Sequence, residues 1–310
     1  MSLNAERAAR AGGASWERRK AYWAFKWKEY GIGYLFMLPW IVGFCAFVAF
    51  PVGWSIFNSF NKISITAEGF QYTWVGFQNY YRMLFENTAY PIILITYFSQ
   101  MLLVIPLILI FAFFVALLLN QKFPGRGFMR TVFFLPVIFA TGQVVVELFS
   151  QGASRLPFME QYNVQELATR YFGNGWARDA IVNVLQQAII ILWYSGVQIL
   201  IFIAGFQTIP RTLYEAIRVD GASPWESFWK ITFPWMIPFI GLCSIYTIVE
   251  LFTYPFNPVL EIVQRNMFAA TTGYGYASAM AWLYFLLILI LILLSLWFTV
   301  RAMRRGGYGR

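Results

Sequence analysis

The sequence contains no histidine, only two cysteines and few charged residues. Charged side chains make up 12% of the 310 positions and apolar ones 59%, whereas soluble domains carry about 25% charged residues. Cys45 and Cys243 both fall within apolar runs, so the sequence supports neither a disulfide framework nor a histidine-based metal site. This composition excludes an ordinary soluble domain and indicates a membrane protein.

A phosphate-binding loop of the form G-x-x-x-x-G-K-[ST] is also missing. The stretch FPGRGFMR, from Phe123 to Arg130, is rich in glycine but lacks the Lys-Ser/Thr ending. We therefore expect no ATP hydrolysis, no cofactor and no metal on this chain. If the protein moves a solute against a gradient, its energy source lies on a different chain.

The formal net charge of +9 suggests nucleic acid as one class of partner. A nucleic-acid-binding protein gathers its basic residues on one soluble face, but here Lys and Arg lie between apolar segments. We therefore expect no nucleic-acid partner, and we attribute the basic excess to membrane topology.

Six apolar runs are long enough to cross a bilayer, which takes about 20 residues. They predict an all-α, polytopic membrane fold with six transmembrane helices, at about residues 31–57, 90–119, 131–149, 180–206, 235–254 and 280–300. Prolines inside these runs are tolerated because neighbouring groups in a membrane bundle bond the freed carbonyls. The first run is too long for a signal peptide, and a basic tail precedes it.

These runs divide the chain into a tail, a first helix, an external loop, a core and a second tail. The boundaries are 1–30, 31–57, 58–89, 90–303 and 304–310. Most of the 23 Lys and Arg residues fall on the side that both tails share, so both termini are predicted to be cytoplasmic. The loop 208–234, between the fourth and fifth helices, faces the same side.

The loop 208–234 is predicted to form two short helices with a break between them. Pro210 suits a first helical position, or Thr212 and Glu215 form a capping box one turn later. The first helix should end where Gly221 follows Asp220, because glycine readily adopts the left-handed conformation of helix ends. We expect a positive φ at Gly221 or a close backbone contact.

The second helix of the loop has its own start signal, since Ser223, Pro224 and Glu226 match a capping box. Pro234 is expected to close this helix before the fifth transmembrane helix. One aromatic face is predicted from residues at helical spacing, namely Trp225, Phe228, Trp229 and Thr232. On physical grounds alone, the loop also fits an amphipathic segment that lies on the membrane surface.

This loop resembles the EAA loop of ATP-binding-cassette (ABC) importer permeases, whose pattern is EAA-x3-G-x9-I-x-LP. The matching positions are Glu215, Ala216, Asp220, Gly221, Ala222, Phe228, Ile231 and Pro234. Ile217 and Phe233 depart from the pattern, each by one apolar residue replacing another. Three further segments are similar to the maltose-type first permease of the carbohydrate-uptake branch: WVGFQNY from Trp74, GRGFMRTVFFLP from Gly125 and AGFQTIP from Ala204.

The resemblance implies a type I ABC importer permease (MetI-like) fold in a bacterial cytoplasmic membrane. It implies import of a carbohydrate, an oligosaccharide in size, delivered by an extracytoplasmic solute-binding protein. The implied partners are a second permease, forming a heterodimer, and two cytoplasmic ATPases that hold ATP and Mg²⁺. The matching loop residues would then couple this chain to the ATPases. Glu215 pairs with a basic ATPase residue, unless it caps the first helix with Thr212.

The external segments 58–89 and 151–179 are implied to meet the binding protein. A self-packed lid is the alternative for the second of them. The segment 151–179 is too long for a tight turn and too polar for the bilayer.

Polar residues inside membrane helices usually mark a solute path. The candidates are Gln143, Glu147, Asn183, Gln187, Trp193, Tyr194, Gln198, Tyr246 and Glu250. Amides and carboxylates offer partners for sugar hydroxyls, and aromatic rings pack on sugar C–H surfaces. The alternative is structural, because such groups also bond between helices and aromatic residues also form interfacial belts.

Two other function classes fit part of the sequence, a self-contained secondary transporter and a membrane scaffold. A secondary transporter usually shows an internal repeat, and we find no convincing repeat between the two halves. A scaffold has no need of the loop pattern. Within the importer class, a polyol or an amino acid stays open as the solute, and a homodimer stays open as the assembly.

Overall fold

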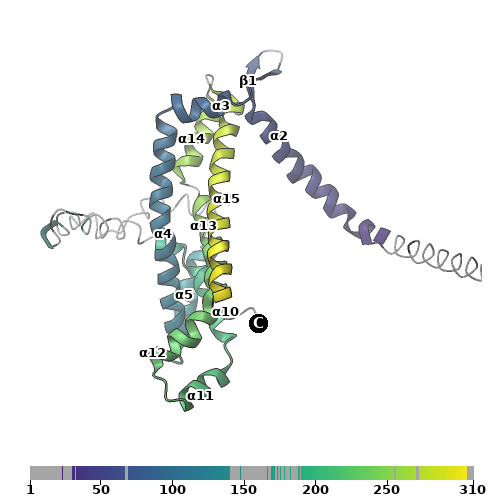
Figure 1. Ribbon diagram of the computed structural model, residues 1–310. Coiled ribbons are helices and arrows are strands. Elements are labelled where there is room, and N and C mark those ends of the chain that lie inside the picture. Colours follow the sequence, from purple (N-terminus) through teal and green to yellow (C-terminus); the bar gives the residue numbers. More distant parts are fainter. Residues whose placement is uncertain are drawn as a thin grey trace, which may run out of the picture.

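The computed structural model describes residues 33–66, 69–139, 190–254, 256–269 and 272–305, together with residues 23, 30, 31, 147, 166, 169–171, 173, 175, 178, 182 and 188. Most of these residues are helical (Figure 1). Within this part of the chain, four helices are long and apolar enough to cross a membrane, and one bent helix pair forms a fifth candidate. About half of the predicted third helix (residues 140–146, 148 and 149) and the first part of the predicted fourth (residues 180, 181, 183–187 and 189) lie outside the described residues.

A bundle of long helices forms the body of the molecule (Figure 1). Its main members are α4 (Ala89–Asn120), α10 (Gly196–Gln207), α13 (Phe233–Phe252) and α15 (Gly273–Arg305). The helix α5 (Arg126–Phe139) packs against α4 and α10. Because all of these helices are apolar on most sides, lipid and core faces are hardly distinguished by hydrophobicity alone.

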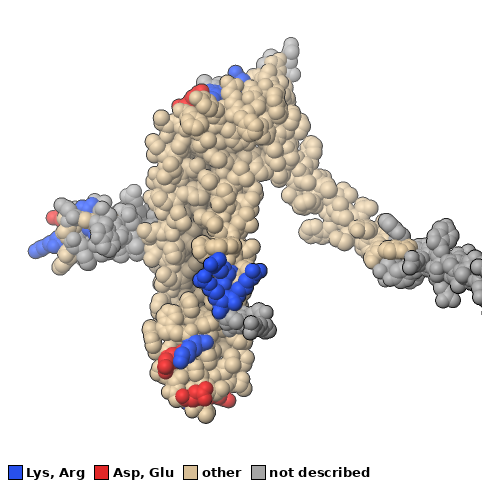
Figure 2. All heavy atoms as spheres, viewed as in Figure 1, with Lys and Arg blue, Asp and Glu red and all other residues tan. Residues whose placement is uncertain are grey.

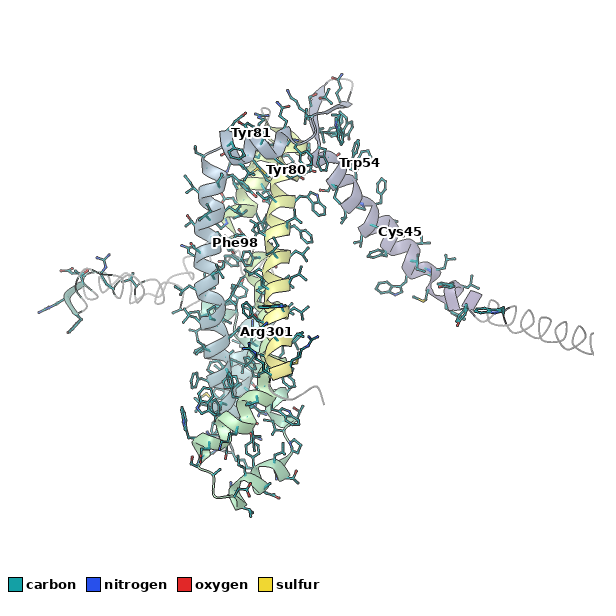
Figure 3. All side chains as sticks on the ribbon, in the orientation of Figure 1. Cys45, Trp54, Tyr80, Tyr81, Phe98 and Arg301 are labelled. Carbon is teal, nitrogen blue, oxygen red and sulfur yellow. The ribbon has the colours of Figure 1, made fainter. Side chains whose placement is uncertain are left out.

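Small residues bring neighbouring helices of the bundle into close contact. A Cβ atom on Gly205 of α10 would lie 2.8 Å from the Phe239 ring of α13, and one on Gly241 of α13 would lie 2.3 Å from Thr299 of α15. Such positions are typical of helix contacts in membranes. Aromatic rings fill the wider spaces, as where Phe98 of α4, labelled in Figure 3, packs on Phe252 with ring centroids 4.7 Å apart.

One end of the bundle carries α11 (Arg211–Val219), α12 (Pro224–Ser227) and η4 (Phe228–Thr232). The prediction that Pro234 closes a helix is wrong, because the chain is helical from Pro224 to Phe252. The π-type turn η4 carries the chain into α13, where Pro234 stands in the first turn. A proline there removes one N–H, and it does not stop the helix.

The other end of the bundle contains the segment between the first two predicted spans, and this segment is ordered. It forms an antiparallel hairpin of β1 (Asn61–Thr66) and β2 (Gly69–Trp74), followed by α3 (Gln78–Tyr81) and η2 (Arg82–Glu86). The short helix α14 (Pro258–Met267) lies between α13 and α15 in sequence and contacts α15 and α4. A Cβ atom on Gly275 of α15 would lie 1.9 Å from the Asn61 carbonyl oxygen, so this glycine lets the hairpin approach α15.

The first long helix runs away from the bundle (Figure 1). It includes η1 (Cys45–Ala49) and α2 (Phe50–Ser59) and extends from Gly33 to Ser59, with none of its apolar window buried. Figure 3 shows Cys45 and Trp54 along this detached helix. The C-terminal end of this helix is anchored on the rest of the molecule, because α2 contacts α15 and β1 there.

Charged side chains gather at the two ends of the bundle on the face shown in Figure 2, and the stretch between is uncharged there. The last turn of α15 carries Arg304 and Arg305. The loop with α11 and α12 extends beyond the level of these arginines. This arrangement suits a membrane layer around the middle of the bundle, with the loop outside it.

Candidate functional site

The helix α11 ends in a Schellman motif, as the Asp220-Gly221 pair predicts. The Gly221 N–H donates to the Arg218 carbonyl at 3.1 Å, and the Ala222 N–H donates to the Ile217 carbonyl at 3.1 Å. This hydrogen-bond pair requires a left-handed residue at Gly221, whose φ is +78°. The predicted positive φ is therefore confirmed, and nothing in the chain lies within 4 Å of a Cβ atom built there.

The start of α11 differs from both alternatives offered by the sequence. Pro210 precedes the helix in an extended conformation, and no side chain caps the first turn. The predicted capping box of Thr212 and Glu215 is thus absent, and the first helical residue is Arg211. The Glu215 side chain is exposed and has no capping role.

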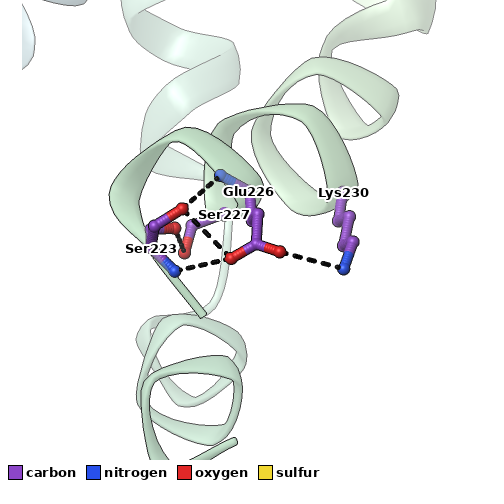
Figure 4. Close-up of polar contacts among 4 residues, drawn as sticks. All are labelled: Ser223, Glu226, Ser227 and Lys230. Atoms are coloured by element: carbon purple, nitrogen blue, oxygen red, sulfur yellow. Dashed lines mark hydrogen bonds and ion pairs between the residues drawn. The ribbon is translucent and has the colours of Figure 1, made fainter. Parts of the chain in front are cut away.

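The second helix of the loop begins with the predicted capping box (Figure 4). The Ser223 N–H donates to Glu226 Oε2 at 2.8 Å, and the Glu226 N–H donates to Ser223 Oγ at 3.3 Å. Lys230 Nζ lies 3.7 Å from Glu226 Oε1. The hydrogen bonds from the Ser223 backbone and hydroxyl, followed by the Lys230 charge, lower the pKa of Glu226. The box was predictable because it depends only on residues three apart in sequence.

The predicted aromatic face anchors the second helix on the bundle. The rings of Trp225 and Trp229 lie 5.6 Å apart, and Phe228 lies 6.2 Å from Phe113 of α4. These rings line an apolar hollow of about 690 Å³ against α4. The fourth predicted member, Thr232, is buried and its Oγ1 shares a hydrogen bond of 2.7 Å with the Tyr214 hydroxyl of α11.

The loop residues that match the EAA pattern therefore fall into two groups. One group lies on the projecting part: Glu215, Ala216, Asp220 and Gly221 are exposed, and Ala222 is half-buried. The other group, Phe228, Ile231 and Pro234, is half-buried on the bundle side. No residue of α11 is buried, and Val219 is 87% exposed. The projecting group thus offers a free surface, and the second group holds it in place.

A polar cluster lies between α10 and α13 inside the bundle. The fully buried Gln198 uses its Nε2 to donate to Thr247 Oγ1 at 2.9 Å and to Glu250 Oε2 at 3.1 Å. The Tyr246 side chain lies beside the Glu250 carboxylate. Thr247 was not predicted, although its position three residues before Glu250 places it on the same helix face.

Of the remaining candidates for a solute path, the structure describes Trp193, Tyr194 and Glu147. Trp193 is half-buried, and Tyr194 is buried with its ring 5.6 Å from that of Tyr254. Glu147 is exposed. Gln143, Asn183 and Gln187 lie outside the described residues. Within the described part of the chain, no group of three His, Cys, Asp or Glu side chains is placed to hold a metal ion.

Comparison with known proteins identifies the family. Residues 91–306 match the family described as "Binding-protein-dependent transport system inner membrane component". The chain is 31% identical over 215 residues to the "Probable ABC transporter permease protein YesP" of Bacillus subtilis (strain 168), covering 67% of this chain and 66% of that protein. It is 28% identical over 214 residues to the "Arabinooligosaccharides transport system permease protein AraP" of Halalkalibacterium halodurans, covering 67% and 64%.

The chain thus spans just under two thirds of the length of these two relatives. Among solved structures, a chain of a bacterial alginate ABC transporter in complex with an alginate pentasaccharide-bound periplasmic protein has a TM-score of 0.57 and 20% identity, covering 89% of this chain and 96% of that chain. This likeness shows a shared fold. With the match over residues 91–306, it follows that the chain belongs to the family of inner membrane components of binding-protein-dependent transport systems.

Proposed function

We propose that this chain is a permease subunit of an ABC importer and that it carries a carbohydrate, an oligosaccharide in size. The family membership supports the transport role, and the name of the relative AraP supports the solute class. An extracytoplasmic solute-binding protein delivers the sugar, and ATP and Mg²⁺ bind to partner ATPases. The chain lies in the cytoplasmic membrane with both termini in the cytoplasm.

The projecting helix α11 is the observation that carries this proposal. It has nine residues and none of them is buried, although isolated helices shorter than about 12 residues are marginal in water. A partner that covers α11 supplies the missing contacts. We propose that this partner is the ATPase, and that Glu215, Ala216, Gly221 and Ala222 lie at the contact.

The mechanical link runs from α11 through the second helix into the bundle. The Tyr214 hydroxyl bonds to Thr232, and the helix of Thr232 continues without interruption into α13. A rigid-body movement of the ATPase against α11 is therefore transmitted to a helix of the translocation bundle.

Gly221→Val tests this coupling. A valine at φ +78° strains the backbone by about 1–3 kcal/mol and changes the turn that presents α11. We expect the apolar helices to insert normally, because their lengths are unchanged, while uptake falls by about tenfold as the ATPase contact is lost. Binding-protein-stimulated ATP hydrolysis should be lost to the same extent. Both are measured in membranes that contain equal amounts of variant and native permease.

Gly125→Val is the matched control. Gly125 also has a positive φ, +86°, with nothing within 4 Å of a built Cβ atom, and it lies in the loop between α4 and α5. This variant carries the same kind of backbone strain outside the residues 208–234, so transport should be nearly normal. Normal uptake and normal stimulated hydrolysis in Gly221→Val would overturn the proposal, and so would equal losses in both variants.

A further inference from the structure

The last turn of α13 is held by two neighbouring helices that are long and apolar enough to cross a membrane. Its last carbonyls accept hydrogen bonds from tyrosines of neighbouring helices: Tyr97 of α4 donates to Leu251 O at 2.7 Å, and Tyr284 of α15 donates to Phe252 O at 2.8 Å. Tyr97 lies about 12 Å beyond the start of α4, and Tyr284 about 16 Å beyond the start of α15, at 1.5 Å rise per residue. Both tyrosines belong to apolar segments that we expect to cross the hydrocarbon. Glu250 stands next to the carbonyls that these tyrosines contact, so we place it at the same depth.

The cluster around Glu250 keeps one polar group without a protein partner. Gln198 is fully buried and donates both of its bonds through Nε2, while Oε1 has no hydrogen-bond partner among the described residues. A buried amide oxygen without a donor is costly. A hydroxyl or ammonium group, of a solute or of water, satisfies it.

One edge of this cluster is not covered by the described part of the chain. Glu250 is half-buried, Tyr246 is 37% exposed, and Thr253, one turn further along, is exposed. Carboxylates at this depth face a bundle interior or a water-filled cavity, because facing lipid is expensive. The exposed edge of α13 therefore lines the inside of the assembled transporter.

The ionisable side chains of the predicted transmembrane segments are acidic, so any charge on the exposed edge of α13 is negative. The six predicted transmembrane segments contain no Lys or Arg, and their only ionisable carboxylates are Glu147 and Glu250. In the described part of the chain, Glu250 accepts a hydrogen bond from the neutral Gln198 side chain, and the neutral Tyr246 side chain lies beside it. This chain therefore contributes either negative charge or none to the path, whatever the protonation of Glu250.

We propose that Glu250 makes the path selective by charge, so that the transported saccharide is neutral or cationic and uronate or sulfonated sugars are disfavoured. This inference rests on the proposed import function and narrows its solute class. Sugar hydroxyls or ammonium groups donate to Glu250 and to Gln198 Oε1, whereas a sugar carboxylate meets like charge and two acceptors. Family membership leaves this property open, because the relatives named above handle arabino-oligosaccharides and alginate, an acidic polymer.

Charged thiol reagents measure this selectivity without knowledge of the solute. Thr253→Cys is placed one turn from Glu250 in a Cys45→Ser background, within the complete complex in lipid vesicles. Its reaction rates are measured with trimethylammonium-ethyl and sulfonato-ethyl methanethiosulfonate, each divided by the rate with free 2-mercaptoethanol. We expect the cationic reagent to be favoured by about tenfold, because a carboxylate acts strongly over one helical turn in a poorly screened site.

Two variants at position 250 assign the effect to the carboxylate. Glu250→Asp keeps the charge and should keep the preference, whereas Glu250→Gln keeps the shape and should bring the ratio to about one. Leu293→Cys, 54% exposed on α15 and within an apolar segment, is the matched comparison and should react far more slowly.

The proposal is overturned if the anionic reagent reacts as fast as the cationic one, if Glu250→Gln leaves the preference unchanged, or if Thr253→Cys reacts no faster than Leu293→Cys. Even if a variant at position 250 fails to fold, the ratio of the two reaction rates of Thr253→Cys, measured with Glu250 in place, still tests the proposal. None of these rates requires transport or ATP hydrolysis. A negative result here therefore leaves the import function standing, and the Gly221 experiment tests that function separately.

Discussion

Gly221 and Gly275 are glycine for different physical reasons. Gly221 has φ +78° and open space around it, so a side chain would strain the backbone. Gly275 has no such φ, but a Cβ atom there would collide with the Asn61 carbonyl oxygen. Substitutions at Gly221 therefore act on a turn that presents a surface, whereas substitutions at Gly275 act on the contact between α15 and the hairpin.

Ser223→Ala removes one half of the capping box and should loosen the start of the second helix in the loop. Losing such a cap costs about 1 kcal/mol, which corresponds to about fivefold faster local amide exchange. We expect this increase at residues 225–227, with exchange in the bundle unchanged. Ser227→Ala is the control, because its hydroxyl only donates to the Ser223 carbonyl. Equal exchange in native protein and Ser223→Ala would contradict a stabilising role for the box.

At the scale of elements, the last carbonyls of α13 accept hydrogen bonds from side chains of three other segments: α4, α15 and the residues that precede α14. Asn257, fully buried between α13 and α14, donates to Phe252 O at 2.9 Å and also to the Tyr284 hydroxyl. Its Oδ1 accepts from the Val259 N–H at 2.9 Å and so caps α14. A helix that ends inside a membrane needs such partners, because lipid offers none.

Asn257→Ala should therefore destabilise the bundle by about 3 kcal/mol, since it removes a helix cap and leaves buried groups unbonded. The thermal midpoint of the detergent-solubilised complex measures this loss. Asn266→Ala is the matched control, because the Asn266 side chain bonds only to Ile262 O within its own helix, and it should cost less than about 1 kcal/mol. Similar midpoints for the two variants would show that Asn257 does not close the end of α13.

At the scale of the whole molecule, none of the apolar window of the helix Gly33–Ser59 is buried by the described residues, and its contacts with α15 lie in α2. Its side chains include exposed aromatic and aliphatic groups along its whole length, which suits lipid on one side and a second protein on the other. The exposed edge of α13 with Glu250 also requires a protein or water to cover it. Both surfaces support the proposal that this chain forms half of a larger translocation unit.

The assembly prediction is that functional complexes contain a second, different permease. The chain presents one α11 and one exposed α13 edge, so a closed path needs a partner that supplies the facing wall. Purification through a tag on this chain, followed by mass spectrometry of the active complex, checks this expectation. An active complex with this chain as its sole permease would contradict it and would establish a homodimer.

The sequence by itself determined the features that depend on neighbours along the chain. The lengths of the apolar runs predicted the positions of the helices that became α4, α13 and α15, and residues three to six apart specified the capping box at Ser223 and the turn at Gly221. Pro234 misled the prediction, because a π-type turn before it, which no local pattern signalled, carries the helix onward.

The tertiary structure decided what depends on residues far apart in sequence. Gln198 and Glu250 meet only because α10 packs on α13, and the last carbonyls of α13 have donors because α4 and α15 place Tyr97 and Tyr284 beside them. The course of the first helix away from the bundle is likewise a tertiary feature that the sequence did not predict. Hydrophobicity specifies that such helices enter a bilayer, but it is nearly uniform around them, so packing and buried hydrogen bonds select which faces meet.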